Sequence, residues 1–321
     1  MDTDPYLLFP ERTPAMQNIK FSGIFSNVLK KHSTEEIETD LIAGTPETTP
    51  PLAVSAYEKP RPWFFFRVLT MSLAAFACFF IGAFFFGNAN FLPGLIFFGA
   101  FITPISLLIF FWEMNILKNI SLYRTTVYLI KGGIVSLLYS VTLYAIVDGY
   151  KSPLLVGLVE ETAKVLALLL LVDHRNYRYV LNGLLIGAAV GTGFAAFESA
   201  GHILVTAMNY GIPTMLGTIF WRAVFAPGNH IAWAALMGAA FLWVKGSRPF
   251  HLSMLLNFKF LGMFAFVVAM HALWDLPIAQ PVIVAVPLLP VLLTILSWTA
   301  LLLMMRLGFL QVYREAEKKA E

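Results

Sequence analysis

From residue 63 onward, long apolar segments alternate with short polar stretches. An apolar run of about 20 residues is long enough to cross the hydrocarbon core of a bilayer as an α-helix. Eight segments of this kind are predicted, over 63–86, 92–112, 126–147, 154–172, 180–205, 227–244, 260–279 and 282–305. The pattern predicts an all-α, polytopic membrane helical bundle of about eight transmembrane helices over 62–305, with no need for strands.

The basic residues between these segments fall in alternate loops. One set of loops and the two tails hold Lys59, Arg61, Lys118, Arg124, Arg175, Arg178, Lys245, Arg248, Lys259, Arg306, Arg314, Lys318 and Lys319, whereas the other set holds only Lys151. Because cytoplasmic loops of membrane proteins carry the excess of Lys and Arg, both termini are predicted to be cytoplasmic. An odd number of spans would break this alternation.

Composition supports the membrane interpretation and separates the tails from the bundle. Hydrophobic residues make up 58% of the chain and charged residues 13%, which excludes an ordinary soluble domain. Residues 1–61 are acidic and rich in Pro and Thr near their end, so they are predicted to be a cytoplasmic, largely disordered tail. Residues 306–321 are predicted to be a cytoplasmic C-terminal tail. The single cysteine excludes a disulfide framework, and a net charge of +3 gives no reason to expect a nucleic-acid partner.

The sixth apolar region is too long for one simple crossing. Proline is favoured in the first turn of a helix, so the crossing is predicted to begin near Pro227. Residues 215–226 are then expected to form an interfacial or re-entrant piece anchored by Trp221 and Arg222.

Four acidic residues lie inside the predicted spans, where a charge is costly: Glu160, Glu161, Glu198 and Asp275. Lys164, His230 and His271 join them. At 1.5 Å per residue, four of them, on four different helices, fall in the outer third of the membrane. Four helices that each place an ionisable group at one depth indicate a single shared polar site.

Residues four apart share one face of a helix. This spacing pairs Glu160 with Lys164, Glu198 with His202, and His271 with Asp275. In the last pair, the carboxylate is expected to orient the imidazole. Glycines at every fourth position, Gly183, Gly187 and Gly191, are interpreted as a helix-packing stripe.

The ordered set of motifs resembles the PrsW family of intramembrane proteases. Residues 160–164 are similar to its EExxK motif, 194–198 to FxxxE, His230 to its lone histidine, and 271–275 to HxxxD, so the family-like core covers about 154–277. The resemblance implies a bacterial inner-membrane enzyme that cuts an anti-sigma factor near the outer face. It also implies kinship with CAAX prenyl endopeptidases and bacteriocin-processing proteins. That branch tends to have His where this chain has Glu198, which argues against farnesylated substrates.

Peptide hydrolysis needs an activated water, stabilisation of the oxyanion and an acid for the leaving amine. The predicted catalytic residues are Glu160, Glu161, Glu198, His230 and His271, with Lys164, Phe194 and Asp275 in supporting positions. Glu160 is expected to be the general base. His230 and His271, with Glu160 or Glu198, are candidate zinc ligands. A metal-free, glutamic-type mechanism with no cofactor is equally compatible.

Two other functions remain open at this stage. Membrane-buried carboxylates and histidines also occur in proton-coupled transporters and channels, although the two halves of this chain show no internal repeat. A non-catalytic scaffold or immunity protein of the same superfamily is the third possibility. For a protease, the expected partners are a single-span membrane protein as substrate and membrane lipid.

Overall fold

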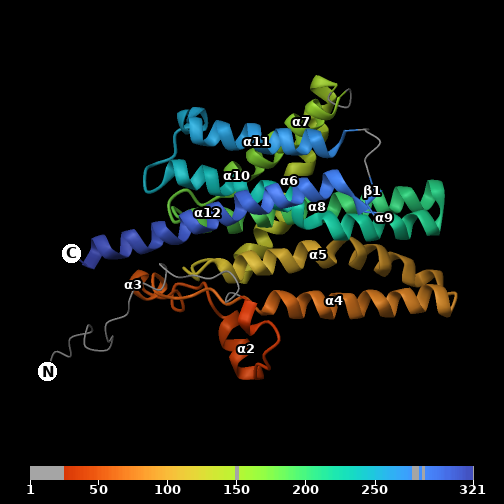
Figure 1. Cartoon of the computed structure of the whole chain (residues 1–321), viewed down its shortest axis with the longest axis horizontal. Coiled ribbons are helices and arrows are strands. Elements are labelled where there is room, and N and C mark those ends of the chain that lie inside the picture. Colours follow the sequence, from red (N-terminus) through yellow and green to blue (C-terminus); the bar gives the residue numbers. More distant parts are fainter. Residues whose placement is uncertain (1–24, 149–151, 277–281, 284–285, 321) are drawn as a thin grey trace.

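The computed structural model describes residues 25–148, 152–276, 282–283 and 286–320, and most of its helices run along one common axis (Figure 1). The helices are α2 (Thr34–Leu41), α3 (Leu52–Ser55), α4 (Phe64–Phe80), α5 (Leu92–Met114), α6 (Leu122–Val147), α7 (Pro153–Leu171), α8 (Val180–Tyr210), α9 (Ile212–Phe225), α10 (His230–Lys245), α11 (Phe258–Trp274) and α12 (Leu288–Ala320). A π-helical turn, Ile81–Phe85, extends α4. Two short strands, β1 (Val282–Ile283) and β2 (Val286–Pro287), pair antiparallel between α11 and α12.

The helical membrane bundle predicted from the sequence is confirmed. Among the described residues, five helices are long and apolar enough to span a bilayer: Phe64–Phe85, Ala89–Met114, Leu122–Val147, Val180–Tyr210 and Leu288–Lys319. The other three predicted spans form α7, α10 and α11, which have 19, 16 and 17 residues. All eight predicted segments therefore contain helix, while their number as membrane crossings stays a prediction.

Helices α8 and α10 form the closely packed centre of the bundle. A Cβ atom added to Gly187 would lie 2.1 Å from the carbonyl oxygen of Ala234, and one added to Gly183 would lie 2.2 Å from that of Gly238. Only glycine permits such an approach of two helix backbones. The glycine stripe predicted for helix packing has that role here, and it places the start of α10 beside α8.

Helix α12 differs from the predicted span of 282–305 at its start. Residues 282–283 and 286–287 form the paired strands β1 and β2, so α12 begins at Leu288. The same helix continues to Ala320, so residues 306–320 are helical, while their cytoplasmic location stays a prediction. Phe309, Val312 and Ala316 are buried on its inner face, and this apolar stripe explains why the helix extends past the last predicted crossing. The predicted end of α11, at residues 277–279, lies outside the described residues.

Residues 25–61 are folded against the basic end of the bundle, which differs from the expectation of a largely disordered tail. His32 stacks on Trp63 with 3.8 Å between ring centroids, and Ala56 is fully buried. Gly44 has a φ of +95° and lies directly against the backbone of Ile120, an approach that a side chain would block. The segment has no core of its own, so it buries its few apolar side chains on a surface that the membrane helices provide. Residues 1–24 lie outside the described part of the chain.

Glu113, at the end of α5, fixes the start of α4. Its Oε1 accepts hydrogen bonds from the backbone N–H groups of Trp63 and Phe64, both at 2.8 Å, and its Oε2 accepts one from Phe65 at 2.9 Å. A carboxylate in this position satisfies free N–H groups of the helix terminus and interacts favourably with its dipole.

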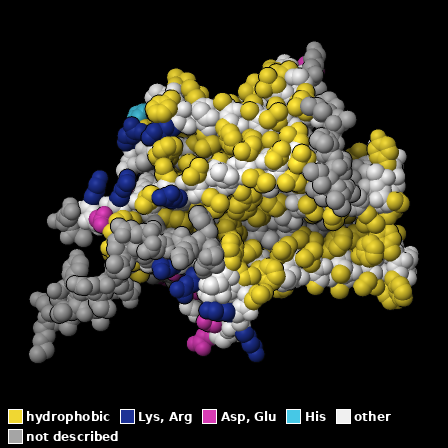
Figure 2. All heavy atoms as spheres, viewed as in Figure 1, with side chains coloured by type: hydrophobic (Ala, Val, Ile, Leu, Met, Phe, Trp, Pro, Cys, Tyr) yellow, Lys and Arg dark blue, Asp and Glu magenta, His cyan; other side chains and the backbone are white. Residues whose placement is uncertain are grey.

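Figure 2 shows the charged side chains gathered at one end of the molecule, while apolar side chains cover the length of the helices. The charged end is the one at which the α10–α11 loop and the C terminus lie in Figure 1. An apolar belt with a basic end is the expected surface of a membrane protein.

Candidate active site

The ionisable residues predicted to share one site are brought together between four helices. Glu160, Glu161 and Lys164 come from α7 and Glu198 from α8, while His230 begins α10 and His271 lies in the last turn of α11. Glu161, Lys164 and His271 are at most 2% exposed, and Glu160 and His230 at most 8%. Buried charges must be paired or used, so this cluster is the chemical centre of the bundle.

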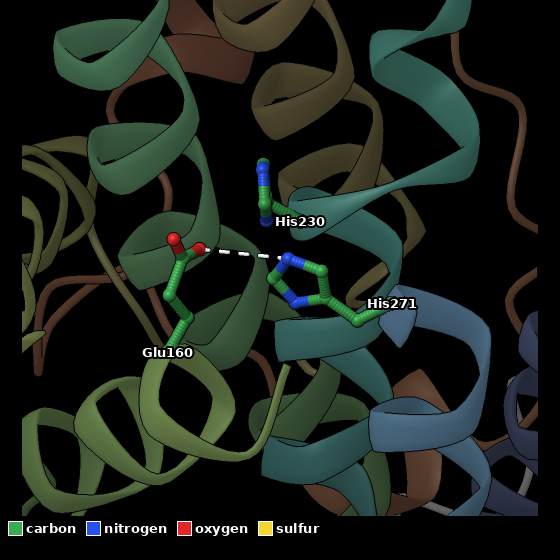
Figure 3. A group of neighbouring side chains, drawn as sticks. All are labelled: Glu160, His230 and His271. Carbon is green, nitrogen blue, oxygen red and sulfur yellow. Dashed lines mark ion pairs between the residues drawn. The ribbon is translucent and has the colours of Figure 1, made fainter. Parts of the chain in front are cut away.

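Glu160, His230 and His271 face one another in the middle of the cluster (Figure 3). Each offers one donor atom, and these three atoms lie within 4.8 Å of one another. His271 Nε2 is 3.6 Å from Glu160 Oε2, and the two imidazole rings are 5.1 Å apart between centroids. A carboxylate and two imidazoles at this separation form a three-ligand set of the kind that holds catalytic zinc.

Glu161 connects α7 to α11. Its Oε1 accepts a hydrogen bond from Lys164 Nζ at 2.6 Å and lies 2.7 Å from His271 Nδ1. The spacing of four residues placed Glu160 on the face of Lys164 and left open which glutamate pairs with it, and the pair forms at a spacing of three residues with Glu161. Because Glu161 takes the Nδ1–H of His271, the Nε2 lone pair faces Glu160.

The predicted contact between Asp275 and His271 is present, and the role of Asp275 in orienting the imidazole stays a prediction. Asp275 Oδ2 lies 3.3 Å from Nε2, the nitrogen that faces Glu160, while Glu161 holds the other nitrogen. The Asp275 side chain is 33% exposed, which makes it the most accessible carboxylate in the cluster. Its position suits contact with water or substrate more than the fixing of a tautomer.

Lys164 extends from α7 to α10. Its Nζ lies 2.8 Å from His230 Nδ1 and 4.3 Å from the ring centroid of Phe194. The face of an aromatic ring attracts a cation, and this attraction strengthens when both groups are desolvated. Phe194, predicted as a supporting residue, also packs on the ring of His230 at 5.2 Å and so forms one wall of the cluster.

Glu198 lies on the far side of His230 and is tied to α9. Its Oε2 is 3.2 Å from His230 Nε2 and accepts a hydrogen bond from Arg222 Nη2 at 2.7 Å. Arg222 Nε also donates to Ser199 at 2.7 Å. Residues 215–225 lie within α9, and Arg222 reaches Glu198 of α8, while the interfacial or re-entrant position of this piece stays a prediction. The predicted contact of Glu198 with His202 is present at 3.4 Å.

Two further residues of the site had no signal in the sequence. Tyr144, on α6, donates its hydroxyl to Glu160 Oε1 at 2.8 Å. Trp233, on α10, packs against the His271 ring at 4.9 Å and donates to Ser297 of α12. Neither residue stands at a motif spacing, since their partners are on other helices. In the sequence, a single Tyr or Trp inside an apolar span is only a weak indication of a site.

The carboxylate oxygens of the cluster are not all satisfied. Glu160 Oε2 and Glu161 Oε2 are buried, and neither has a hydrogen-bond partner among the described residues. An orphaned carboxylate oxygen is costly unless a cation or water binds it. Glu160 Oε2 is also the oxygen nearest His271 Nε2, so the atom that lacks a partner points at the other donor atoms. The residues present fit a divalent metal ion.

Comparison with known proteins identifies the family to which the chain is similar. The family model described as PrsW family intramembrane metalloprotease matches residues 77–304, which is more than two thirds of the chain. The match is much longer than the core of about 154–277 that the sequence motifs suggested, and it includes α5 to α11 completely. Searches of curated proteins and of solved structures found no match.

Proposed function

This chain belongs to the PrsW family of intramembrane metalloproteases, and we propose that it hydrolyses its substrate at the cluster of Glu160, His230 and His271. The observation that carries this assignment is the convergence of the three donor atoms within 4.8 Å, inside the helical bundle. Membership of this family favours a membrane endopeptidase over the transporter and scaffold alternatives.

Zinc is the metal proposed for this site. The donor set of one carboxylate and two imidazoles is typical of catalytic zinc with a coordination position left open, and Glu160 Oε2 has no other partner to satisfy it. When bound, the ion supplies a nucleophilic water at neutral pH and polarises the scissile carbonyl. Glu160 then acts as a ligand, and its predicted role as general base passes to another carboxylate.

The residues around the three ligands hold and orient them. Glu161 fixes the tautomer of His271 through Nδ1, and Tyr144 fixes Glu160 through Oε1. His230 has Lys164 on one nitrogen and Glu198 on the other. For His230 to bind a metal ion through either nitrogen, the contact of that nitrogen with Lys164 or Glu198 must therefore break.

Asp275 is the proposed proton acceptor. Glu161 is unsuitable because its Oε1 already has two donors and its side chain is fully buried. Asp275 lies 3.3 Å from His271 Nε2 and has a third of its side chain exposed, so it can exchange protons with water. A general base must lie close enough to the reacting water to accept its proton, and it must then be able to pass that proton on to solvent.

The proposed substrate is a single-span membrane protein, for example an anti-sigma factor, cut near the outer face of a bacterial inner membrane. His230 and His271 lie at the ends of α10 and α11 that are far from the loop joining these helices. Figure 2 shows the charged side chains gathered at the end that holds this loop, and the positive-inside rule predicts that this end is cytoplasmic. The remaining candidate residues, Glu198 and Lys164, position His230 rather than contact the substrate.

Cleavage of a panel of single-span membrane proteins by the full chain in proteoliposomes tests this function. Wild type is expected to cut at least one member near the outer end of its span, while Glu160→Gln and His271→Ala leave it intact. Lys131→Ala is the control, because Lys131 is an exposed residue of α6. Cleavage that persists in both site variants would remove the cluster as the active site.

A further inference from the structure

The loop between α10 and α11 carries a cavity at the basic end of the bundle. It has a volume of about 440 Å³, and its polar lining comes from Arg248, His251, Ser253 and Asn257. None of the described residues that line it is Asp or Glu. A cavity with basic and neutral donors and no carboxylate selects for an anion.

The cations around this cavity have no acidic partners. Lys245 is 2% exposed, and its Nζ donates only to the backbone carbonyls of Tyr177 and Gly246, both at 3.1 Å. Arg248 donates to the carbonyls of Val244 and Lys245. Within the described part of the chain, no carboxylate oxygen lies within 4.0 Å of either side chain. Asp173 acts on Lys245 only through its field, so neither cation is held in a close ion pair and an anion from outside the chain can approach both.

An apolar surface borders the cavity. Leu252 is 73% exposed, Leu256 74% and Phe258 77%, and all three lie in the loop or the first turn of α11. Lys259, the next residue, places its Nζ 4.2 Å from the ring centroid of Trp243. Large apolar side chains beside Lys, Arg and Trp are typical of a segment seated at the level of the lipid headgroups.

We propose that this cavity binds the phosphate-bearing headgroup of an anionic phospholipid, with the acyl chains lying along Leu252, Leu256 and Phe258. Arg248 and His251 donate to the phosphate, and the buried Lys245 adds a positive charge that no hydrogen-bonded carboxylate holds. Lipid is favoured over free phosphate because the three apolar side chains are in place to contact acyl chains. Basic pockets at the cytoplasmic ends of membrane helices bind anionic lipids by the same physics.

The site is separate from the catalytic cluster but shares two helices with it. Helix α10 begins with His230 and ends with Lys245, 16 residues that span about 22 Å. Helix α11 begins beside Lys259 and carries His271 in its last turn. A lipid that contacts α10 and α11 at the loop between them would stabilise the packing of these two helices, which supply His230 and His271.

The test uses the purified full chain in a neutral detergent, titrated with short-chain phosphatidylglycerol, phosphatidylcholine or inorganic phosphate. Binding is followed by native mass spectrometry and by the shift in the unfolding temperature. Phosphatidylglycerol is expected to bind and stabilise more strongly than phosphatidylcholine. Arg248→Gln is expected to weaken that binding by about tenfold, since one charge-assisted contact is lost.

Arg314→Gln is the matched control, because it removes an equally exposed positive charge at the same end, on α12, outside the cavity. Should Arg248→Gln fail to fold, His251→Gln and Leu256→Ser test the headgroup and acyl contacts separately. Equal binding of the two lipids by wild type would overturn the proposal, and so would equal effects of Arg248→Gln and Arg314→Gln. A stabilisation reproduced by inorganic phosphate alone would show an anion site without lipid recognition.

Discussion

Glu161 Oε1 lies 2.7 Å from His271 Nδ1, so a carboxylate on α7 determines which nitrogen of a histidine on α11 is free. The same oxygen holds the ammonium of Lys164, which in turn lies 2.8 Å from His230. One glutamate therefore organises both histidines, although it contributes no atom to the three-residue donor set.

Replacement of Glu161 is expected to cost stability, whereas replacement of Glu160 is not. Glu161→Gln leaves the Lys164 ammonium buried without its counter-charge, which typically costs about 3–5 kcal/mol. Glu160→Gln keeps an oxygen for the Tyr144 hydroxyl and leaves the Lys164 ammonium with Glu161 as its partner. Thermal unfolding of both variants in detergent, with chelator present so that metal makes no contribution, measures the difference. Equal stabilities would contradict the assignment of the ion pair to Glu161.

Arg222 is expected to act on activity through Glu198. Its guanidinium holds Glu198, whose Oε2 is 3.2 Å from His230 Nε2. Loss of an outer partner of a metal-ligating histidine typically lowers metal affinity or activity by about 10- to 100-fold. Arg222→Ala is expected to lower kcat in this range with KM nearly unchanged, and Arg222→Lys is expected to restore part of it. An equal loss in both variants, or a change confined to KM, would point instead to substrate binding by Arg222.

The contact between α8 and α10 is expected to tolerate no side chain at Gly187. A Cβ atom there meets the Ala234 backbone at 2.1 Å, so Gly187→Ala must push the helices apart, at a cost of about 1–3 kcal/mol. Gly201→Ala, in the same helix, has nothing within 4 Å and serves as the control. Unfolding temperatures of the two variants in detergent compare the sites. Similar values would show that the close approach is not needed for stability.

Glu113 is expected to stabilise the start of α4 through its three backbone partners. Glu113→Gln removes the charge and one of the two accepting oxygens, and loss of such a helix-terminal acceptor costs about 0.5–2 kcal/mol. Glu58→Gln is the control, since Glu58 pairs with Lys118 in a half-exposed salt bridge of small expected value. Hydrogen exchange of Trp63 to Phe65 gives the local measurement. Faster exchange in both variants, or in neither, would contradict this role.

The sequence was sufficient to predict the convergence of the site. An ionisable residue inside an apolar span must find a partner, and Glu160, Glu198, His230 and His271 each lay at the same depth on a different helix. The pairing within the cluster was not predictable. Glu160 and Glu161 differ by about 100° around α7, and only the position of α11 decides which of them reaches His271 Nδ1.

Features that depend on the packing of distant elements were missed for the same reason. The contact of Arg222 with Glu198 was not predicted because the direction of α9 relative to α8 is not encoded in local spacing. Tyr144 stands on a helix whose other residues give no motif. The fold of residues 25–61 depends on a surface built by α4, α5 and α12, so the acidic, Pro-rich composition of that segment suggested disorder.

Zinc content of the purified full chain, measured together with cleavage, is the most direct test of the central claim. Wild type is expected to hold about one zinc ion per chain, and Glu160→Gln, His230→Ala and His271→Ala are each expected to lose both metal and activity. His202→Ala, whose side chain is 58% exposed, is expected to retain both, and Asp275→Asn is expected to keep the metal but lose cleavage. Full zinc content in the three ligand variants, or a wild type that still cleaves after complete removal of metal, would contradict the account.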